Sequence, residues 1–192
     1  PESFTFAEDS SLVEDFSGFV DDIDEDGLVL TVSENINITV SIDEFAVSFG
    51  ALQDFNGTET ITFTINDNQG RAIASDSLNV IVLSVNDPPV LDSLGVQVTQ
   101  EDSDSTIVVT AFDPDVEMNG QTLEFSAVSN DETLVLVSTP SGDGTGVGTL
   151  TFDVQDDQIG SAEITVIVSD GNFEYDSEVF VLTVDPVNDA PV

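Results

Sequence analysis

Acidic side chains recur in the same order in the two halves of this 192-residue chain. The corresponding groups are Glu8 and Glu101, Asp22-x-Asp24 and Asp113-x-Asp115, Asp54 and Asp157, Asp67 and Asp170, and Asn86-Asp87 and Asn188-Asp189. All of these side chains offer oxygen atoms. In proteins, such sets of oxygen ligands bind hard divalent cations.

The spacing of the paired aspartates favours metal binding over simple exposure. Residues i and i+2 of an extended segment point the same way, so Asp113 and Asp115 can hold one ion or bridge two. Two carboxylates about 4 Å apart repel by about 4 kcal/mol at an effective dielectric constant near 20. Calcium accepts six to eight oxygen ligands, whereas magnesium requires a tighter octahedron, so we predict Ca²⁺.

An EF-hand is the first alternative to test against the sequence. The segment Asp22-x-Asp24-x-Asp26-Gly27 copies the first six positions of such a loop. The twelfth position should be Glu but is Ser33, and residues 28–32 alternate like a strand instead of opening a helix. The sequence therefore favours calcium without an EF-hand.

Composition excludes several classes of function. There are 39 acidic residues, one basic residue, no histidine and no cysteine, which gives a formal charge of -38. The sequence therefore offers no Ser-His-Asp triad, no ordinary zinc site and no basic patch for nucleic acid. No apolar run is long enough to insert in a membrane. Carboxylate pairs also serve glycosidases, but the acids map to module ends, so we predict no enzyme.

The elements that position these acids are predicted to be strands. Runs rich in Val, Ile, Thr and Phe alternate with period two, as in residues 61–65 and 164–168, and turn signals separate them. The motifs Val85-Asn86-Asp87-Pro88-Pro89-Val90 and Val187-Asn188-Asp189-Ala190-Pro191-Val192 mark the repeat seams. We predict an all-β chain of two tandem Ig-like antiparallel β-sandwiches arranged end to end, over residues 1–87 and 88–192.

The order of Glu, Asp-x-Asp, an Asp-bearing loop, Asn/Ser-Asp and Val-Asn-Asp-x-Pro resembles the cadherin repeat. It is similar above all to the cadherin-like tandem repeats of large bacterial surface adhesins. The resemblance implies Ca²⁺ at each junction. One module would supply Glu8 and Asp54, the linker Asn86 and Asp87, and the next module Asp113, Asp115 and Asp170. Asp22, Asp24 and Asp67 would face a preceding module, and Glu101, Asp157, Asn188 and Asp189 a following one.

The linkers depart from the family pattern, which normally reads Asp-x-Asn-Asp-Asn. Ser84 and Pro186 replace the first Asp, and Pro88 and Ala190 replace the last Asn. With fewer ligands in each junction, we expect one or two ions instead of three.

The resemblance implies a secreted or cell-surface bacterial protein in which calcium stiffens the repeats into an extender for a binding head. Its partners would be calcium and neighbouring repeats of the same chain. The alternative is a calcium-dependent binding module for polysaccharide or for homotypic cell adhesion. The chain opens at Pro1 and stops in a linker, so we expect it to be part of a longer protein.

Overall fold

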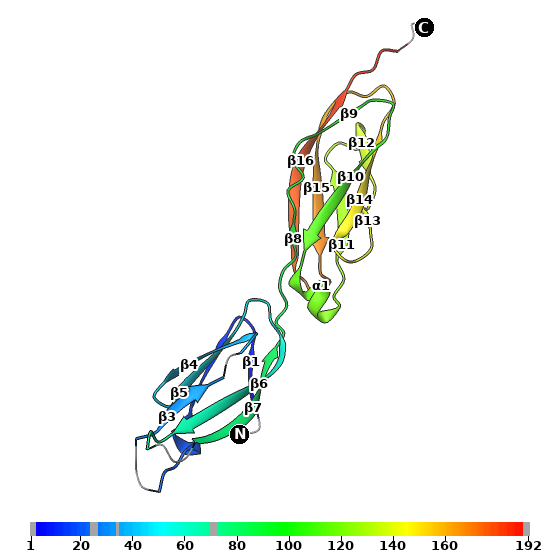
Figure 1. Ribbon diagram of the computed structural model, residues 1–192. Helices are drawn as coiled ribbons and strands as arrows, with labels where there is room; N and C mark the ends of the chain where they lie inside the picture. The colour runs from blue at the N-terminus through cyan, green and yellow to red at the C-terminus, as the bar shows by residue number, and fades with distance from the viewer. Residues whose placement is uncertain (1–2, 24–26, 34, 70–72, 190–192) are drawn as a thin grey trace. The chain divides into compact units, whose positions relative to one another are not determined.

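The computed structural model describes residues 3–23, 27–33, 35–69 and 73–189. The chain divides into two compact units, Pro1–Val85 and Asn86–Val192. Each unit consists of two β-sheets that face one another around a hydrophobic core (Figure 1). The division falls two residues before the predicted boundary, because Asn86 and Asp87 hydrogen bond to side chains of the second unit.

Unit 1 contains seven described strands and one short 3-10 helix. They are β1 (Ser3–Ala7), β2 (Ser11–Asp15), η1 (Phe16–Phe19), β3 (Val29–Val32), β4 (Ile38–Asp43), β5 (Ala46–Ala51), β6 (Gly57–Asn66) and β7 (Ile73–Leu83). The first sheet has the order β1-β7-β6-β3 and the second the order β2-β5-β4. All pairs are antiparallel except β1 with β7, which is parallel.

Alternation along the strands builds the core of unit 1. Ile61 and Phe63 of β6 are buried against Val47 and Phe49 of β5, from the opposite sheet. Phe16 of η1 joins them, with its ring centroid 4.9 Å from that of Phe63. Because alternate strand residues face opposite ways, the same strands present Thr and Ser to solvent.

Unit 2 has the same plan with two additional short strands and a short helix. Its elements are β8 (Val90–Leu91), β9 (Gln97–Gln100), β10 (Ser105–Phe112), α1 (Pro114–Asn119), β11 (Glu124–Ser129), β12 (Val135–Val137), β13 (Ser141–Gly142), β14 (Val147–Val154), β15 (Gly160–Ser169) and β16 (Tyr175–Asp185). One sheet has the order β11-β15-β16-β9, and the other β12-β14-β10-β8 with β13 on β14.

The first strand of unit 2 is divided between the two sheets. Its first part, β8, pairs antiparallel with β10, and its second part, β9, pairs parallel with β16. The strands β13 and β14 form a glycine-rich antiparallel hairpin. Gly146 is required there, because its φ is +100° and a Cβ atom would lie 2.2 Å from the carbonyl oxygen of Ala111.

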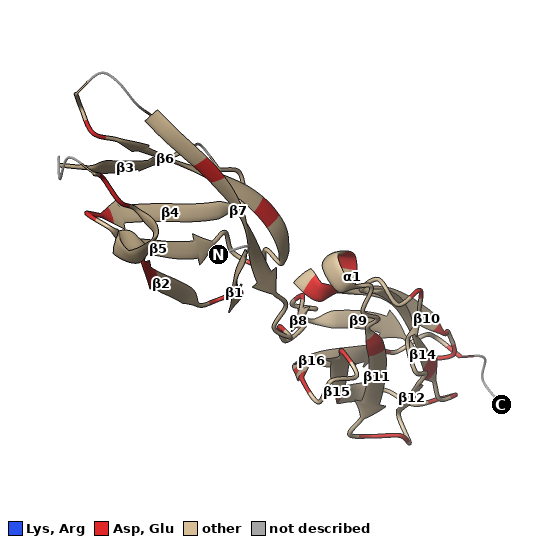
Figure 2. Ribbon diagram, turned by 90° about the horizontal axis from the view of Figure 1, so that it is seen from below, with Lys and Arg blue, Asp and Glu red and all other residues tan. Residues whose placement is uncertain are grey.

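The predicted all-β, tandem Ig-like sandwich fold is confirmed. Acidic residues lie on α1, in the loops and on strands of both units (Figure 2). The prediction omitted η1, α1 and the short strands β2, β8 and β13, whose alternation is too brief to detect. No helix among the described residues is long and apolar enough to cross a membrane.

Candidate metal sites

Three aspartates are buried together at one end of unit 2. Asp113, Asp115 and Asp170 have exposed fractions of 2%, 3% and 5%. Asp113 and Asp115 lie at the start of α1, and Asp170 follows β15. Charged side chains are almost never buried to this degree without a partner of opposite charge. We call Asn86, Asp87, Asp113, Asp115, Asp170 and Glu174 the Asp113 site.

The short helix α1 determines how Asp113 and Asp115 are presented. Asp113 is the N-cap residue, and one of its carboxylate oxygens accepts a hydrogen bond of 2.8 Å from the amide of Asp115. Pro114 begins the helix, and Gly120 ends it in the left-handed conformation. The cap of a helix therefore brings the two aspartates together. The prediction that they lie on an extended segment is wrong, because Asp115 is in the first turn of α1.

The linker residues of unit 2 belong to the same site. The backbone amide of Asp87 donates to Oδ2 of Asp115 at 2.9 Å. The side-chain amide of Asn86 donates to Oδ2 of Asp170 at 2.7 Å and to Oε2 of Glu174 at 2.8 Å. Unit 2 thus gathers the predicted residues Asn86, Asp87, Asp113, Asp115 and Asp170 in one network.

Neutral amides satisfy most of the remaining oxygen atoms in the Asp113 site. Nε2 of Gln121 donates to Oδ1 of Asn86, and the side-chain amide of Asn119 donates to Asp115. The amides of Asn172 and Glu174 donate to Oδ1 of Asp170, at 2.7 and 3.3 Å. Burial opposes the ionisation of Asp170, but these donors together lower its pKa.

One oxygen of the Asp113 site has no partner. Oδ2 of Asp113 is buried and accepts no hydrogen bond. Burial raises the pKa of Asp113, and the nearby carboxylates of Asp115, Asp170 and Glu174 raise it further, although the amide of Asp115 acts in the opposite direction. A buried oxygen without a donor, surrounded by carboxylates, is the environment that a calcium ion fits.

Unit 1 holds a similar oxygen on Glu8, the residue directly after β1. Glu8 has an exposed fraction of 2%, and its Oε1 accepts a hydrogen bond of 2.7 Å from the amide of Val85. Its Oε2 is buried and has no hydrogen-bond partner. Glu101 of unit 2 repeats the arrangement, accepting from the amide of Val187 at 2.8 Å. Glu8 and Glu101 thus each accept a hydrogen bond from the second residue after the last strand of their unit.

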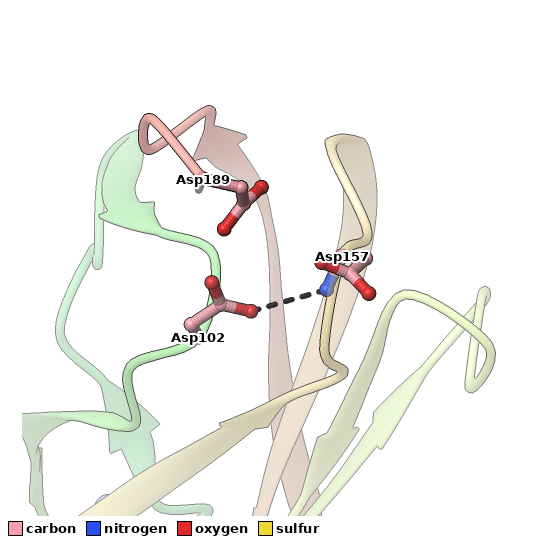
Figure 3. Close-up of side chains that lie close together, drawn as sticks. All are labelled: Asp102, Asp157 and Asp189. Carbon is pink, nitrogen blue, oxygen red and sulfur yellow. Dashed lines mark hydrogen bonds between the residues drawn. The ribbon is translucent and has the colours of Figure 1, made fainter. Parts of the chain in front are cut away.

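A second acidic group lies at the other end of unit 2 (Figure 3). Asp102, Asp157 and Asp189 are exposed, and one carboxylate oxygen from each lies within 4.8 Å of the others. Oδ1 of Asp102 also accepts a hydrogen bond of 3.1 Å from the amide of Asp157. Within the described parts of the chain, this is the one acidic triad that meets this distance criterion.

The remaining predicted residues have simpler surroundings. Asp67 is partly buried and accepts a hydrogen bond of 2.9 Å from the amide of Gln69. Asp22 and Asp54 are partly buried, and Asp54 has a φ of 57°, as Asp157 has 58°. Asn188 is exposed, and its side-chain amide donates to the carbonyl of Asp189. Asp24 lies outside the described residues.

The prediction omitted several residues that the sites contain. Asp102 stood in the sequence as the second member of a recurring Glu-Asp pair, so the repeat itself could have identified it. Glu174 could have been found only from its position shortly after Asp170. Asn119, Gln121 and Asn172 carry no signal, because isolated amides near turns are common.

Comparison with solved structures identifies the fold. Human CDH23 EC21-23 is 16% identical, with a TM-score of 0.60 over 96% of this chain and 73% of that one. Drosophila N-cadherin EC1-4 is 19% identical, with a TM-score of 0.57 over 95% and 48%. Protocadherin Gamma B2 domains 1-5 are 18% identical, with a TM-score of 0.57 over 85% and 34%. The chain therefore spans about a third of the protocadherin's length.

Family comparison agrees with the structural one. A search of curated proteins gave no match. The family model of the bacterial Ig domain matches residues 1–82 and again residues 86–183. The two matches cover both units and nearly the whole chain. The chain belongs to the bacterial Ig domain family, as two tandem repeats with a cadherin-like β-sandwich fold.

Proposed function

We propose that this chain is a calcium-rigidified pair of extracellular repeats from a bacterial surface adhesin. In this role it holds a binding head away from the cell and is not itself an enzyme. Calcium at the seam between the repeats restrains the short linker, and without it the linker bends.

The observation that carries the proposal is the pair of buried oxygens without hydrogen-bond donors, Oδ2 of Asp113 and Oε2 of Glu8. Leaving a buried acceptor unsatisfied costs about 1–3 kcal/mol, and more when the group is charged. No lysine or arginine lies among the described residues to neutralise either carboxylate. A bound cation or protonation would compensate the charge of these groups, and we propose a bound cation because several carboxylates lie together in the Asp113 site.

The sequence repeat supports placing these ligands on one seam. The amide of Val85 donates to Glu8, and the next residue along the chain, Asn86, begins the network of the Asp113 site. The exposed triad of Asp102, Asp157 and Asp189 indicates a second donor set, whose repeat counterparts are Asp9, Asp54 and Asp87. We propose that each seam uses both sets, with one or two ions.

When bound, calcium supplies a positive charge that links carboxylates from successive repeats. This chain's own residues position the donors. The N-cap of α1 holds Asp113, Asn86 holds Asp170 beside Glu174, and Val85 orients Glu8. Extracellular modules bind calcium with dissociation constants of about 10⁻⁴–10⁻³ M. At a tenfold excess over that constant, each site adds about 1.4 kcal/mol of stability.

Calorimetric calcium titration of the full chain tests the proposal, together with thermal unfolding and small-angle scattering. We expect saturable binding, a higher unfolding temperature and a narrower distribution of particle lengths as calcium rises. The double variant Asp113→Ala, Asp115→Ala should lose most of these responses while both units remain folded. Glu132→Gln, an exposed change of charge in the same unit, is the control and should behave like the parent.

Two results would contradict the proposal. One is an absence of calcium binding at millimolar concentration in the parent chain. The other is a double variant that responds to calcium as strongly as the parent does, which would place the binding residues elsewhere.

A further inference from the structure

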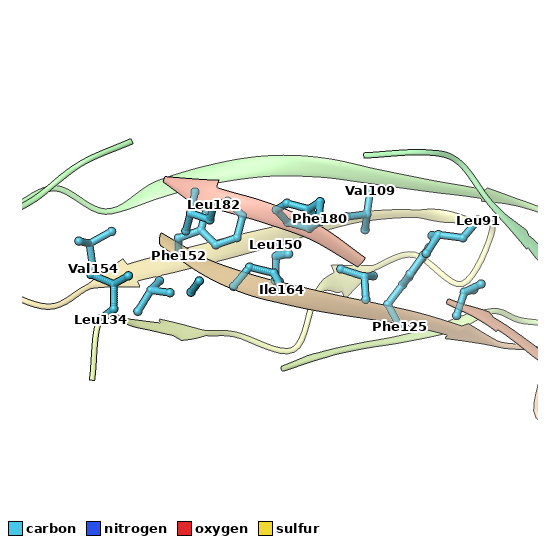
Figure 4. Close-up of a cluster of buried hydrophobic side chains, with 14 of the residues drawn as sticks. Leu91, Val109, Phe125, Leu134, Leu150, Phe152, Val154, Ile164, Phe180 and Leu182 are labelled. Carbon is cyan, nitrogen blue, oxygen red and sulfur yellow. The ribbon is translucent and has the colours of Figure 1, made fainter. Parts of the chain in front are cut away.

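Unit 2 carries an apolar patch on the outer face of one of its sheets. The sheet has the order β11-β15-β16-β9, and its inner face covers the core, where Figure 4 shows Phe125, Ile164 and Phe180. Because strand residues alternate between the two faces, the neighbours of these residues along the strands point away from the core. The outer face includes five valines that are 39–71% exposed, and we call them the valine face: Val96, Val98, Val128, Val179 and Val181.

The strand registers place the five valines near one another. Val128 of β11 and Val179 of β16 pair with the same residue of β15, so they belong to one row across three strands. Val181 follows two residues later on β16 and therefore lies on the same face. The strand β9 pairs with the next part of β16 and adds Val98, with Val96 two residues earlier. The valine face thus extends across the sheet from β11 to β9.

Matching strand registers identify the counterpart of each valine in unit 1. The two units pair equivalent strands in the same way, so one matched pair fixes the equivalence of two whole strands. The pairs Leu30–Ile65, Ile61–Leu78 and Phe4–Val80 of unit 1 match the pairs Phe125–Val168, Ile164–Phe180 and Gln97–Leu182 of unit 2. The counterparts of the five valines are therefore, in the same order, Ser3, Thr5, Ser33, Ser77 and Asn79.

The corresponding face of unit 1 is polar. All five counterparts are exposed. Ser77 exchanges a hydrogen bond of 2.8 Å with Thr62, and Asn79 accepts one of 2.8 Å from Thr60. Unit 1 therefore folds with hydroxyl and amide groups at these positions, and the sandwich does not require valine there. Exposed apolar patches that do not serve the core are typical of interaction surfaces.

The charge of the chain indicates what kind of partner fits the valine face. The chain has 39 acidic residues and one basic residue, so a basic partner would be attracted to acidic surfaces of either unit. Among the described strand partners of the valines, Glu163 alone is acidic. It pairs with Val181, and the side-chain amide of Asn130 on the opposite side donates to it at 3.4 Å. Another strongly acidic chain can therefore approach here with few carboxylates brought together.

We propose that the valine face binds the same face of a second copy of this chain. A twofold axis places one patch on the other, and an uncharged apolar patch is complementary to itself. Five partly exposed valines cover less than the about 800 Å² that each partner of a stable complex buries, so the dimer is weak and reversible. The association uses none of the acidic residues of the metal sites. Its outcome is therefore separable from that of the calcium proposal.

Sedimentation of the full chain over a range of protein concentrations tests the proposal, at low and high sodium chloride and with a calcium chelator present. We expect a monomer–dimer equilibrium that becomes stronger as salt rises, because salt screens the repulsion between two chains of charge -38. An interface made of ion pairs would become weaker instead. A chain that stays monomeric at millimolar concentration in high salt would contradict the proposal.

The matched variant gives the valine face the residues of unit 1. It carries Val96→Ser, Val98→Thr, Val128→Ser, Val179→Ser and Val181→Asn. Unit 1 folds with these residues at equivalent positions, so the sheet should be retained, and thermal unfolding checks that it is. We expect the association constant to fall by at least about a hundredfold, from lost apolar burial. The control is Val108→Thr with Val147→Thr, 62% and 49% exposed on the other sheet, which should associate like the parent.

Glu163→Gln provides a gain of association, which a loss of folding cannot imitate. Removing the carboxylate beside Val181 should strengthen dimerisation several-fold, most of all at low salt. Glu132→Gln removes an equal charge from an exposed position outside the face and should have little effect. Equal association of the parent and the five-valine variant, or equal effects of Glu163→Gln and Glu132→Gln, would place the contact on another surface and overturn the proposal.

Discussion

Units 1 and 2 have the same sandwich fold but differ in the strands at the edges of their sheets. In unit 2, β8 covers one side of the core, and Leu91 is buried there with Phe125. In unit 1 the corresponding place is an open groove beside Phe19 and Leu78. Because stability depends on buried apolar area, the same fold should be less stable in unit 1 than in unit 2.

The acidic ends of unit 2 differ as well. The Asp113 site buries three aspartates and leaves one oxygen without a donor, whereas Asp102, Asp157 and Asp189 remain exposed to water. Water can screen the exposed charges but not the buried ones. The contrast predicts that a change of charge at the buried site alters stability even without calcium, and that the same change at the exposed triad does not.

Truncation of matched core phenylalanines should give the largest effects. Phe49 and Phe152 occupy corresponding positions, and each is 1% exposed. Phe→Ala at either position should cost about 3–5 kcal/mol, from lost burial and the cavity left behind. We expect Phe49→Ala to unfold unit 1 at room temperature, whereas unit 2 should remain folded with Phe152→Ala.

Hydrogen exchange resolved by strand measures both variants in the full chain. The unaltered unit of each variant is the internal control. Equal unfolding of both units, or survival of unit 1 alone, would show that the open groove does not lower the stability of unit 1.

The sequence predicted the sandwich and most strands because long alternating runs, such as those of β6 and β15, report which face is buried. It did not predict β2, because Leu12 and Val13 are followed directly by Glu14 and Asp15 and only two apolar residues mark that edge. Nor did it predict β8, where two prolines precede the strand and pairing extends over only two residues. Short edge strands are defined by their neighbours more than by their own composition.

Asp113→Asn should have the next largest effect, and its sign should depend on calcium. Asparagine is as good an N-cap as aspartate, so α1 is retained. Without calcium, removing one charge from among Asp115, Asp170 and Glu174 should raise the free energy of unfolding by about 1–2 kcal/mol. With millimolar calcium the parent should gain stability and the variant should gain little.

Asp102→Asn at the exposed triad is the matched comparison. Its φ of 56° is one that asparagine tolerates, so the backbone should not be strained. Without calcium we expect a change within about 0.5 kcal/mol, as for most exposed substitutions. Chemical unfolding with and without calcium tests both variants. A loss of stability on Asp113→Asn in the absence of calcium would mean that the buried charges are compensated in another way.

The residue types of the Asp113 site were predictable and its geometry was not. The repeat identified Asp113, Asp115, Asp170, Asn86 and Asp87, because oxygen donors recur there in a fixed order. The amides of Asn119, Gln121 and Asn172 belong to the network only because α1 and the turn after β15 bring them near. The recurring order of residues in the sequence therefore predicted the oxygen donors. The hydrogen bonds between them depend on the tertiary structure.

Glu59→Gln should have a smaller effect than Asp113→Asn and should make unit 1 respond to pH differently from unit 2. Glu59 of β6 accepts hydrogen bonds from the amides of Ile36, Asn37 and Ile38, at 2.6, 3.0 and 2.9 Å. The corresponding residue of β15 is Ala162, which is buried and carries no charge. Burial alone would raise the pKa of Glu59, but the three amides lower it below its usual value of 4.5.

A carboxyl whose pKa is lowered by folding stabilises the folded state above its unfolded pKa, and this contribution is lost as pH falls through the folded pKa. Glu59→Gln should therefore cost unit 1 about 1 kcal/mol near neutral pH, and the difference from the parent should shrink once Glu59 is protonated. Urea unfolding followed by hydrogen exchange across acidic and neutral pH measures it. Glu124→Gln, which changes an exposed carboxyl on β11, is the control and should show no such convergence. A cost for Glu59→Gln that stays constant into acid would mean that the contribution of Glu59 does not depend on its ionisation.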